Sequence, residues 1–322
     1  MRTPAPAWLF HAPVVYSQRS IDVGILQRDS LDMDLTETLG ACRDLHRRFP
    51  QLIEQESAYV AKHDIGLVVG DIPPLGFEVA ARSSIPSVAI SNFVWSWIYR
   101  AYVCHRPGFL PLIEEMERFY STTTLALTLP YSCNMDVFPR QEPIPWIART
   151  SNLTKAEARK AFELPQAAVI VLLSFGGFGM DRLPWNILRD LRDFFFVTTG
   201  KSKQIDGNVL ILPNVQRHYE DLVRAVDVVV TKPGYGIVAD AIAHQVAVLY
   251  TERGDFPEYP RLVEALNDCA TATFIPQREL LSGNLAPYLT SLLQKERNWP
   301  AVPLAGATVG AEKIVTLLDR PR

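Results

Sequence analysis

The sequence predicts an α/β protein made of two Rossmann-like, doubly wound domains, each built on a parallel sheet. Three observations support this fold class. The chain has 322 residues, a length typical of about two domains. Short β-branched runs with the length of buried strands alternate along the chain with longer segments of helical periodicity. Two of these runs end in glycine turns, as strands do when a ligand binds at the carboxyl edge of a parallel sheet.

The composition indicates folded domains and excludes several classes of protein. Hydrophobic residues make up 48% of the chain and charged residues 21%, which excludes global disorder. The formal net charge is −3 and the isoelectric point is about 6.1, so the chain lacks the basic footprint of a nucleic-acid-binding protein. No segment approaches the roughly 20 apolar residues that span a bilayer, and prolines interrupt residues 1–15, where a signal peptide has an apolar core. We therefore expect a cytoplasmic protein without a transmembrane segment.

The cysteines indicate neither a disulfide framework nor a metal site. They lie far apart without a CxxC pair, which fits free thiols in a reducing cytoplasm; they are Cys42, Cys104, Cys133 and Cys269. Cys104 is next to His105, but no further ligand lies at the spacing of a metal site. We expect neither a metal nor another cofactor.

Residues 1–145 are predicted to form the first domain. Its strands are expected at residues 21–27, 65–69, 87–90 and 124–129. Its helices are expected at residues 32–62, 76–83 and 108–120, the first of them broken near Pro50. The aromatic segment 91–99 fits either the core or a groove for an apolar or lipid-linked acceptor. Prolines between residues 138 and 145 mark the expected end of the domain.

Residues 146–305 are predicted to form the second, doubly wound domain. Its strands are expected at residues 167–173, 194–197, 209–212, 228–230, 246–250 and 272–275. Helices are expected at residues 185–192, 218–226, 237–244, 260–268 and 286–296. The remaining residues, 306–322, are expected to form a C-terminal helix that packs back on the first domain.

The stretch from Asp227 to Leu262 predicts a βαβ unit with a glycine turn. The first N–H groups and the positive dipole end of its helix point toward the carboxyl edge of the sheet, which attracts phosphate. Glycine in the turn lets a diphosphate approach the backbone and permits a positive φ. Asp240, about one helical turn further on, is within reach of ribose hydroxyls. Its alternative role is to stabilise the helix N-terminus without any ligand.

Three runs of the sequence resemble glycosyltransferase-like proteins of the two-domain GT-B fold: VVVTKPGYGIVADAI, LLSFGGFG and IPSVAISNFVWSWIY. They look more closely like the glycosyltransferase-like module that precedes the kinase in plant L-arabinokinases, and like its stand-alone bacterial relatives. The cell-wall enzyme that adds N-acetylglucosamine to lipid-linked muramyl peptide is a more distant likeness. The resemblance covers essentially the whole chain. It implies a nucleotide-sugar donor, with a UDP-sugar expected, bound mainly by the second domain without a metal.

The resemblance also implies which residues bind the donor. The residues that match its two glycine turns are Gly176, Gly177, Lys232, Gly234, Tyr235 and Gly236. Asp240 stands where relatives usually have a glutamate, which implies a ribose contact of shorter reach. Glu258 matches an acidic position in a loop that would face the donor sugar, and a solvated charge is the alternative.

The resembling proteins begin with a strand and a GHGFGH-like loop that faces the acceptor, where a general base is expected. This sequence contains no such loop, so we expect an N-terminally incomplete first domain. Either the true start lies upstream, or the protein has lost the loop. Among the histidines, His105, which follows the aromatic segment, is the remaining candidate for the base.

Three functions are compatible with these observations. The first is transfer of a sugar from a nucleotide-sugar donor to an unidentified acceptor. The second is nucleotide-sugar binding without catalysis, as in a regulatory module. The third is epimerisation of a sugar nucleotide on the same two-domain architecture, which the fold alone does not separate from the others.

Overall fold

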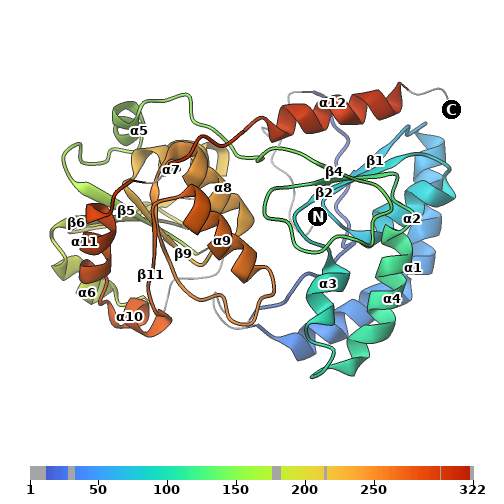
Figure 1. Ribbon diagram of the computed structural model, residues 1–322, viewed down its shortest axis with the longest axis horizontal. Helices are drawn as coiled ribbons and strands as arrows, with labels where there is room; N and C mark the ends of the chain where they lie inside the picture. The colour runs from blue at the N-terminus through green and yellow to red at the C-terminus, as the bar shows by residue number, and fades with distance from the viewer. Residues whose placement is uncertain (1–11, 28–32, 176–182, 214–215, 298, 320–322) are drawn as a thin grey trace. The chain divides into compact units, whose positions relative to one another are not determined.

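The computed structural model describes residues 12–27, 33–175, 183–213, 216–297 and 299–319. The chain forms two compact units, shown in Figure 1. Of the described residues, the first unit contains 12–27, 33–147 and 305–319, and the second unit contains those between 148 and 304. The chain therefore passes from the first unit to the second and then returns.

The first unit is built on a parallel sheet with the strand order β1-β2-β3-β4. Its strands are β1 (Val68–Gly70), β2 (Ser87–Ser91), β3 (Leu125–Thr128) and β4 (Gln141–Pro143). Its helices are α1 (Leu35–Lys62), α2 (Pro74–Arg82), α3 (Trp95–Arg100), α4 (Leu110–Tyr120) and α12 (Gly306–Leu318). One cluster of buried side chains joins α1, α2 and α4, and another joins β2 and β3 to α12.

The predicted break in the first helix is wrong, because α1 runs through Pro50 without interruption. Proline inside a helix removes one hydrogen bond and costs about 3 kcal/mol or more. Buried residues on both sides of the proline, Phe49 and Ile53 among them, hold the helix in one hydrophobic cluster with α2. Tertiary packing therefore offsets the local cost.

The predicted strand at residues 21–27 is also wrong. Residues 12–26 form neither helix nor strand, and Gln27 makes an isolated bridge with Met33. Ile21 and Val23 are instead partly buried against the cluster of α1 and α2. Their apolar character reflects this packing, which needs no strand partner.

The second unit is built on a sheet with the strand order β11-β10-β9-β5-β6-β8-β7. The strands are β5 (Val169–Ser174), β6 (Phe194–Gly200), β7 (Gln204–Asp206), β8 (Val209–Pro213), β9 (Val228–Thr231), β10 (Ala247–Tyr250) and β11 (Ala272–Phe274). All neighbours pair in parallel except β7, which is antiparallel to β8. Strand β5 comes first in the chain yet lies between β9 and β6, so the strand order reverses there. Such a switch point is where open α/β sheets bind ligands.

Helices cover both faces of this sheet (Figure 1). They are α5 (Lys155–Ala161), α6 (Trp185–Asp190), α7 (Tyr219–Ala225), α8 (Tyr235–His244), α9 (Tyr259–Cys269), α10 (Gln277–Ser282) and α11 (Ala286–Gln294). Alternate residues of β5 point into two separate cores: Val171 packs with residues of α6, α10 and α11, whereas Leu172 packs with residues of α5 and α7. The doubly wound α/β fold predicted from the sequence is confirmed.

Candidate functional site

The candidate site lies where strands β5 and β9 end side by side. Ser174 pairs with Thr231 at the carboxyl ends of these strands. The Thr231 hydroxyl donates to the Ser174 carbonyl oxygen at 2.6 Å, and the Ser174 hydroxyl lies 2.5 Å from the hydroxyl of Tyr219 at the start of α7. These bonds fix the two strand ends, and therefore the backbone that leaves them.

Helix α8 follows β9 directly, with Gly234 as its N-cap residue. The N–H of Val238 donates to the carbonyl oxygen of Gly234 at 3.1 Å and closes the first helical turn. The N–H groups before it, those of Gly236 and Ile237 among them, have no acceptor within the helical pattern. Gly236 is exposed, so the positive end of the helix dipole is accessible here.

Nothing in the described residues requires glycine at the start of α8. Gly234 has an extended backbone, with φ −131°, and Gly236 has no positive φ either. Among the residues that the structure describes, chain neighbours and the backbone of the same helix apart, a Cβ atom at either position would meet no atom within 4 Å. By contrast, Gly283 has φ +82°, and its Cβ would lie 2.7 Å from Ile187. Gly234 and Gly236 therefore do not use the positive φ that glycine permits, whereas the space beside them among the described residues is open to a ligand.

Two further predicted residues lie beside this helix start. Lys232 is half-buried, and its carbonyl oxygen accepts from the Thr231 hydroxyl at 2.8 Å. Tyr235 is the first residue of α8, and its hydroxyl oxygen is buried. Burial, together with the negative charge of Glu258, raises the pKa of the Tyr235 hydroxyl well above its ordinary value. The hydroxyl therefore stays protonated and can donate a hydrogen bond.

Glu258 lies in the loop between β10 and α9, and its side chain is 2% exposed. The Arg253 guanidinium donates to its carboxylate at 2.6 Å and also lies over the Phe256 ring, 4.0 Å from the centroid. The alternative of a solvated charge at Glu258 is therefore wrong. The loop is held by a buried ion pair, and removal of one partner would leave an uncompensated charge.

Asp240 is buried on α8 and is bound by Arg149. Its Oδ1 accepts from the backbone N–H of Arg149 at 3.1 Å, and its Oδ2 lies 3.2 Å from the guanidinium. The guanidinium also lies 3.7 Å from Glu220 and stacks over the Tyr219 ring at 5.7 Å. Arg149 thus places a positive charge beside α7 and α8, a role that no sequence pattern indicated.

His244 lies one helical turn after Asp240 on α8 and binds Ser151, two residues after Arg149. Its Nε2 accepts from the backbone N–H of Ser151 at 2.9 Å, so this nitrogen carries no proton. Its Nδ1 therefore carries the proton and donates to the Asp240 carbonyl oxygen at 2.7 Å. The imidazole is neutral in this arrangement. His244 thus helps to hold residues 149–151 on α8.

The structure thus brings Lys232, Gly234, Tyr235 and Gly236 together at one edge of the second sheet, with Glu258 close enough to Tyr235 to influence its hydroxyl. Asp240 lies on the same helix but faces Arg149. Gly176 and Gly177 fall outside the described residues.

The candidate base His105 is exposed in the turn that follows α3, in the first unit. His46 on α1, which we did not single out, is buried, and its Nδ1 lies 2.6 Å from Glu115 Oε2. A histidine paired with a carboxylate is a common arrangement for proton transfer. The pair was not visible in the sequence because its members belong to different helices.

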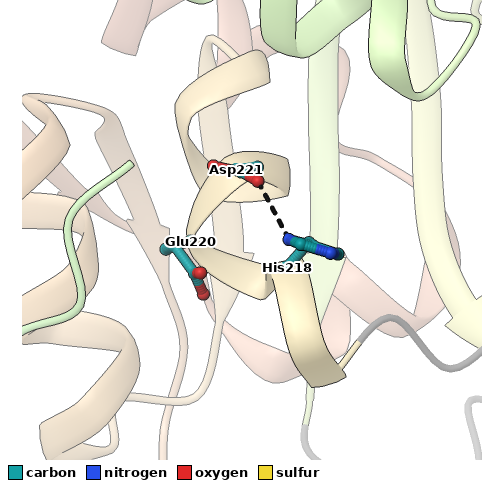
Figure 2. A group of neighbouring side chains, drawn as sticks. All are labelled: His218, Glu220 and Asp221. Atoms are coloured by element: carbon teal, nitrogen blue, oxygen red, sulfur yellow. Dashed lines mark ion pairs between the residues drawn. The ribbon is translucent and has the colours of Figure 1, made fainter. Parts of the chain in front are cut away.

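Figure 2 shows a second cluster of charged side chains, His218, Glu220 and Asp221, at the start of α7. One ligand atom from each lies within 4.8 Å of the others, which is compatible with a metal ion. The carboxylates already have protein partners, however. Asp221 accepts from the Ser151 hydroxyl at 2.5 Å and pairs with His218 at 3.3 Å, and Glu220 faces the Arg149 guanidinium. That positive charge disfavours a cation at Glu220.

Among the described residues, no helix combines the length and apolar character needed to cross a membrane. No model of a known protein family matches the chain. A curated protein from Arabidopsis thaliana, L-arabinokinase, is 26% identical over 303 residues, which cover 89% of this chain. The matched region makes up 28% of that protein, so the chain spans well under a third of its length.

Solved structures of glycosyltransferases are similar to the chain along most of its length. The calicheamicin glycosyltransferase CalG4 is similar with a TM-score of 0.59 and 13% identity, covering 89% of this chain and 82% of that one. Arabidopsis thaliana UGT89C1, solved in complex with UDP, has a TM-score of 0.54 and 12% identity, covering 88% and 82%. The glycotransferase of kitacinnamycin has a TM-score of 0.57 and 18% identity, covering 91% and 81%. The chain therefore has the two-domain, Rossmann-like GT-B fold of glycosyltransferases.

Proposed function

We propose that the chain binds a nucleotide sugar, with UDP as the expected nucleotide, at the start of α8 and transfers the sugar to an acceptor hydroxyl. The GT-B fold and the likeness to a glycosyltransferase in complex with UDP support the substrate class. The switch point between β5 and β9 supports the location.

This proposal rests on the two glycines at the start of α8, Gly234 and Gly236. Within the described part of the chain, neither backbone conformation nor packing calls for glycine at 234 or 236, yet both stand at the positive end of a helix at the switch point. A diphosphate that bound here would approach the N–H groups without a side chain in between. In this proposal the donor-binding residues are Gly176, Gly177, Lys232, Gly234, Tyr235, Gly236, Asp240 and Glu258.

The chemistry required of such a site is mainly electrostatic. As the bond between the anomeric carbon and the diphosphate breaks, negative charge builds up on the diphosphate. N–H groups already aimed at that position stabilise the charge without reorganisation. Lys232 adds a positive charge beside the same turn, and the protonated Tyr235 hydroxyl adds a donor. A base is needed for the acceptor hydroxyl.

We propose that the transfer needs no divalent metal, because Lys232 and the helix dipole supply the positive charge. EDTA should therefore leave the rate of transfer unchanged. The cluster of His218, Glu220 and Asp221 in Figure 2 is the place to look if EDTA abolishes transfer. In that case Asp221→Asn should reproduce the loss, and the metal-free proposal would be wrong.

Thermal unfolding with UDP, GDP and dTDP tests donor binding directly. A nucleotide at 100 times its dissociation constant stabilises the folded state by about 2.7 kcal/mol, which corresponds to a shift of several degrees in Tm. We expect UDP to give the largest shift. Equal or absent shifts with all three nucleotides would contradict the proposed donor site.

A second candidate function is nucleotide-sugar binding without transfer. The likeness to part of L-arabinokinase supports it, because a binding module attached to a kinase needs no base for an acceptor hydroxyl. A UDP shift with no donor turnover, across a panel of alcohol and sugar acceptors, would favour this candidate. We also propose a cytoplasmic location, which the four free thiols support.

A further inference from the structure

The segment 149–151, which forms neither helix nor strand, lies on helix α8 in the second unit. Arg149 and Thr150 are exposed to solvent. The two residues of α8 that the segment contacts, Asp240 and His244, are only 5% and 6% exposed. The segment therefore separates two buried side chains from the solvent.

Both carboxylate oxygens of Asp240 are bonded to Arg149. Oδ1 accepts from the backbone N–H at 3.1 Å, and Oδ2 accepts from the guanidinium at 3.2 Å. A ribose hydroxyl that binds Asp240 must donate to one of these oxygens, which are acceptors only when the carboxylate is ionised. The side chain of Asp240 is 7% exposed beneath this contact. The role proposed for Asp240 in donor binding therefore requires Arg149 to move away from it.

The Arg149 guanidinium has a second carboxylate close by. Its Nη1 lies 3.7 Å from Glu220 Oε2, which is beyond hydrogen-bond distance. Within the described part of the chain, this oxygen of Glu220 is buried without a hydrogen-bond partner. A shift of the guanidinium toward Glu220 would satisfy that oxygen and would offset the loss of Asp240. Arg149 thus has two alternative partners, as a two-state element requires.

Ser151 is the fixed point of the segment. Its N–H donates to His244 Nε2 at 2.9 Å, and its hydroxyl donates to Asp221 Oδ1 at 2.5 Å. Neither bond involves the carboxylate of Asp240. Arg149 can therefore leave that carboxylate by rotation of the backbone between positions 149 and 151, while Ser151 stays in place.

We propose that Arg149 makes an autoinhibitory contact with the donor site, from which the ribose of a bound nucleotide displaces it toward Glu220; this rests on the proposed function. The two ribose hydroxyls replace the two donors that Arg149 supplies, so the buried carboxylate of Asp240 keeps its hydrogen bonds. Because the nucleotide must compete with Arg149, its apparent affinity is lower than the affinity for an uncovered site. Removal of the competitor increases the affinity.

Amide hydrogen exchange in the full chain tests the displacement, with UDP and 2′,3′-dideoxyuridine diphosphate as probes. The second probe keeps the base and the diphosphate but lacks both ribose hydroxyls. At saturation UDP should accelerate exchange of the Arg149 N–H several-fold, because this group loses Asp240 as its acceptor. The dideoxy probe should not, and the Ser151 N–H should keep its rate with either. Unchanged or slower exchange at Arg149 with UDP, or equal acceleration at both amides, would overturn the proposal.

Titration calorimetry with Arg149→Gln tests the competition. This variant keeps the backbone N–H but lacks the charge of the guanidinium, so UDP should bind several-fold more tightly than to the wild type. Arg189→Gln is the matched control, because Arg189 is 41% exposed in the same unit, against 49% for Arg149, and pairs with Asp206 instead. Each variant removes one positive charge, which by itself weakens the binding of an anion. Weaker binding of UDP to Arg149→Gln would make Arg149 a donor contact and overturn the proposal.

Glu220→Gln tests the second position of the guanidinium. Displaced Arg149 would then lack a charged partner, so UDP should bind several-fold more weakly than to the wild type. The loss of a negative charge alone would have the opposite effect on an anion. Affinity at or above the wild-type value would overturn the movement toward Glu220.

The outcomes separate this inference from the donor site itself. If neither UDP nor the dideoxy probe raises the Tm, the proposed donor site is wrong and the inference falls with it. If both probes raise the Tm equally and exchange at Arg149 does not change, the donor site stands, and the contact between Arg149 and Asp240 is structural only.

Discussion

Glycine at position 236 costs the folded protein helix stability. Glycine within a helix is about 0.5–1 kcal/mol less favourable than alanine, because more backbone freedom is lost on folding. No contact with a described residue offsets this cost at Gly236, because its backbone is helical and the space that a Cβ atom would occupy is open. A residue that weakens the fold without a structural reason is expected where a ligand needs the room.

Gly236→Ala should therefore act in opposite directions on two measurements. The free energy of unfolding without ligand should rise by about 0.4–1 kcal/mol, whereas the increase in Tm caused by UDP should shrink. Gly40→Ala is the control, because Gly40 lies in α1, its Cβ would meet no described atom within 4 Å outside the helix backbone, and it is remote in sequence from the donor site. It should stabilise the protein without changing the UDP effect. An undiminished UDP effect in Gly236→Ala would argue against the site.

His46 makes stability depend on pH. Its pKa is lowered in the folded protein by burial, so the unfolded chain takes up the proton first as the pH falls. The stabilising contribution is complete well above the unfolded value of about 6.5 and is lost as the pH drops through 6.5 toward the folded pKa. Chemical unfolding between pH 8 and 5 should show this loss in the wild type and a smaller one in His46→Gln. If the free energy of unfolding depends on pH equally in the two proteins, the assignment of a buried neutral imidazole is wrong.

At the scale of elements, helix α8 serves two purposes along its length. Its first turn forms the proposed phosphate site, and its second and third turns hold the segment 149–151 through Asp240 and His244. Asp240 and His244 are four residues apart, so they lie on one face of the helix. The segment they hold is where the chain enters the second unit.

Comparison of Asp240→Asn with Arg149→Gln separates the ribose role of Asp240 from its structural role. Both variants weaken the same pair, and we expect each to lower the free energy of unfolding by about 1–2 kcal/mol, because one member is buried and the other half-exposed. In our proposal only Asp240→Asn should also reduce the UDP-induced rise in Tm. If both variants respond to UDP as the wild type does, Asp240 holds the segment and has no ribose contact.

At the scale of the whole molecule, the first unit is completed by the end of the described chain. Helix α12 covers strands β2 and β3 through Leu317, and its Lys313 pairs with Glu142 of β4. The bonds from Lys313 and Arg140 lower the pKa of Glu142. The helix starts in close contact with residues 145 and 146, where the Gly306 N–H donates to the Trp146 carbonyl oxygen at 3.0 Å.

Gly306→Ala should destabilise the first unit selectively. A Cβ at this position would lie 2.1 Å from the Pro145 carbonyl oxygen and 2.6 Å from that of Trp146, and neither is a flexible side-chain end. Overpacking of this kind costs about 1–3 kcal/mol. In calorimetry we expect UDP to raise the Tm of the second unit. Gly306→Ala should lower the Tm of the other transition, that of the first unit. Gly310→Ala is the matched control, because its Cβ would make ordinary contacts at 3.7 Å. Equal effects of the two substitutions would contradict this account.

Sequence patterns predicted the helices and strands whose conformation depends mainly on residues close to one another in the chain. The β-branched runs near residues 228 and 246 became β9 and β10, because a central parallel strand is buried on both faces. The same reasoning failed at residues 21–27, where apolar side chains pack without a strand partner, and at Pro50, where the core overrides the break. At the site, the glycine turn was visible as a motif. The pairs Arg149 with Asp240 and His46 with Glu115 were not, because 91 and 69 residues separate their members and no periodicity reports such contacts.

The return of the chain to the first unit has a consequence for biosynthesis. During translation the second unit is complete before α12 leaves the ribosome, so it can fold cotranslationally as an independent module. At rates of about 5–20 residues per second, α12 emerges roughly 8–35 s after β4. Throughout that interval the apolar side chains of β2 and β3 that contact Leu317 are uncovered, and exposed apolar surface of this kind favours aggregation of nascent chains.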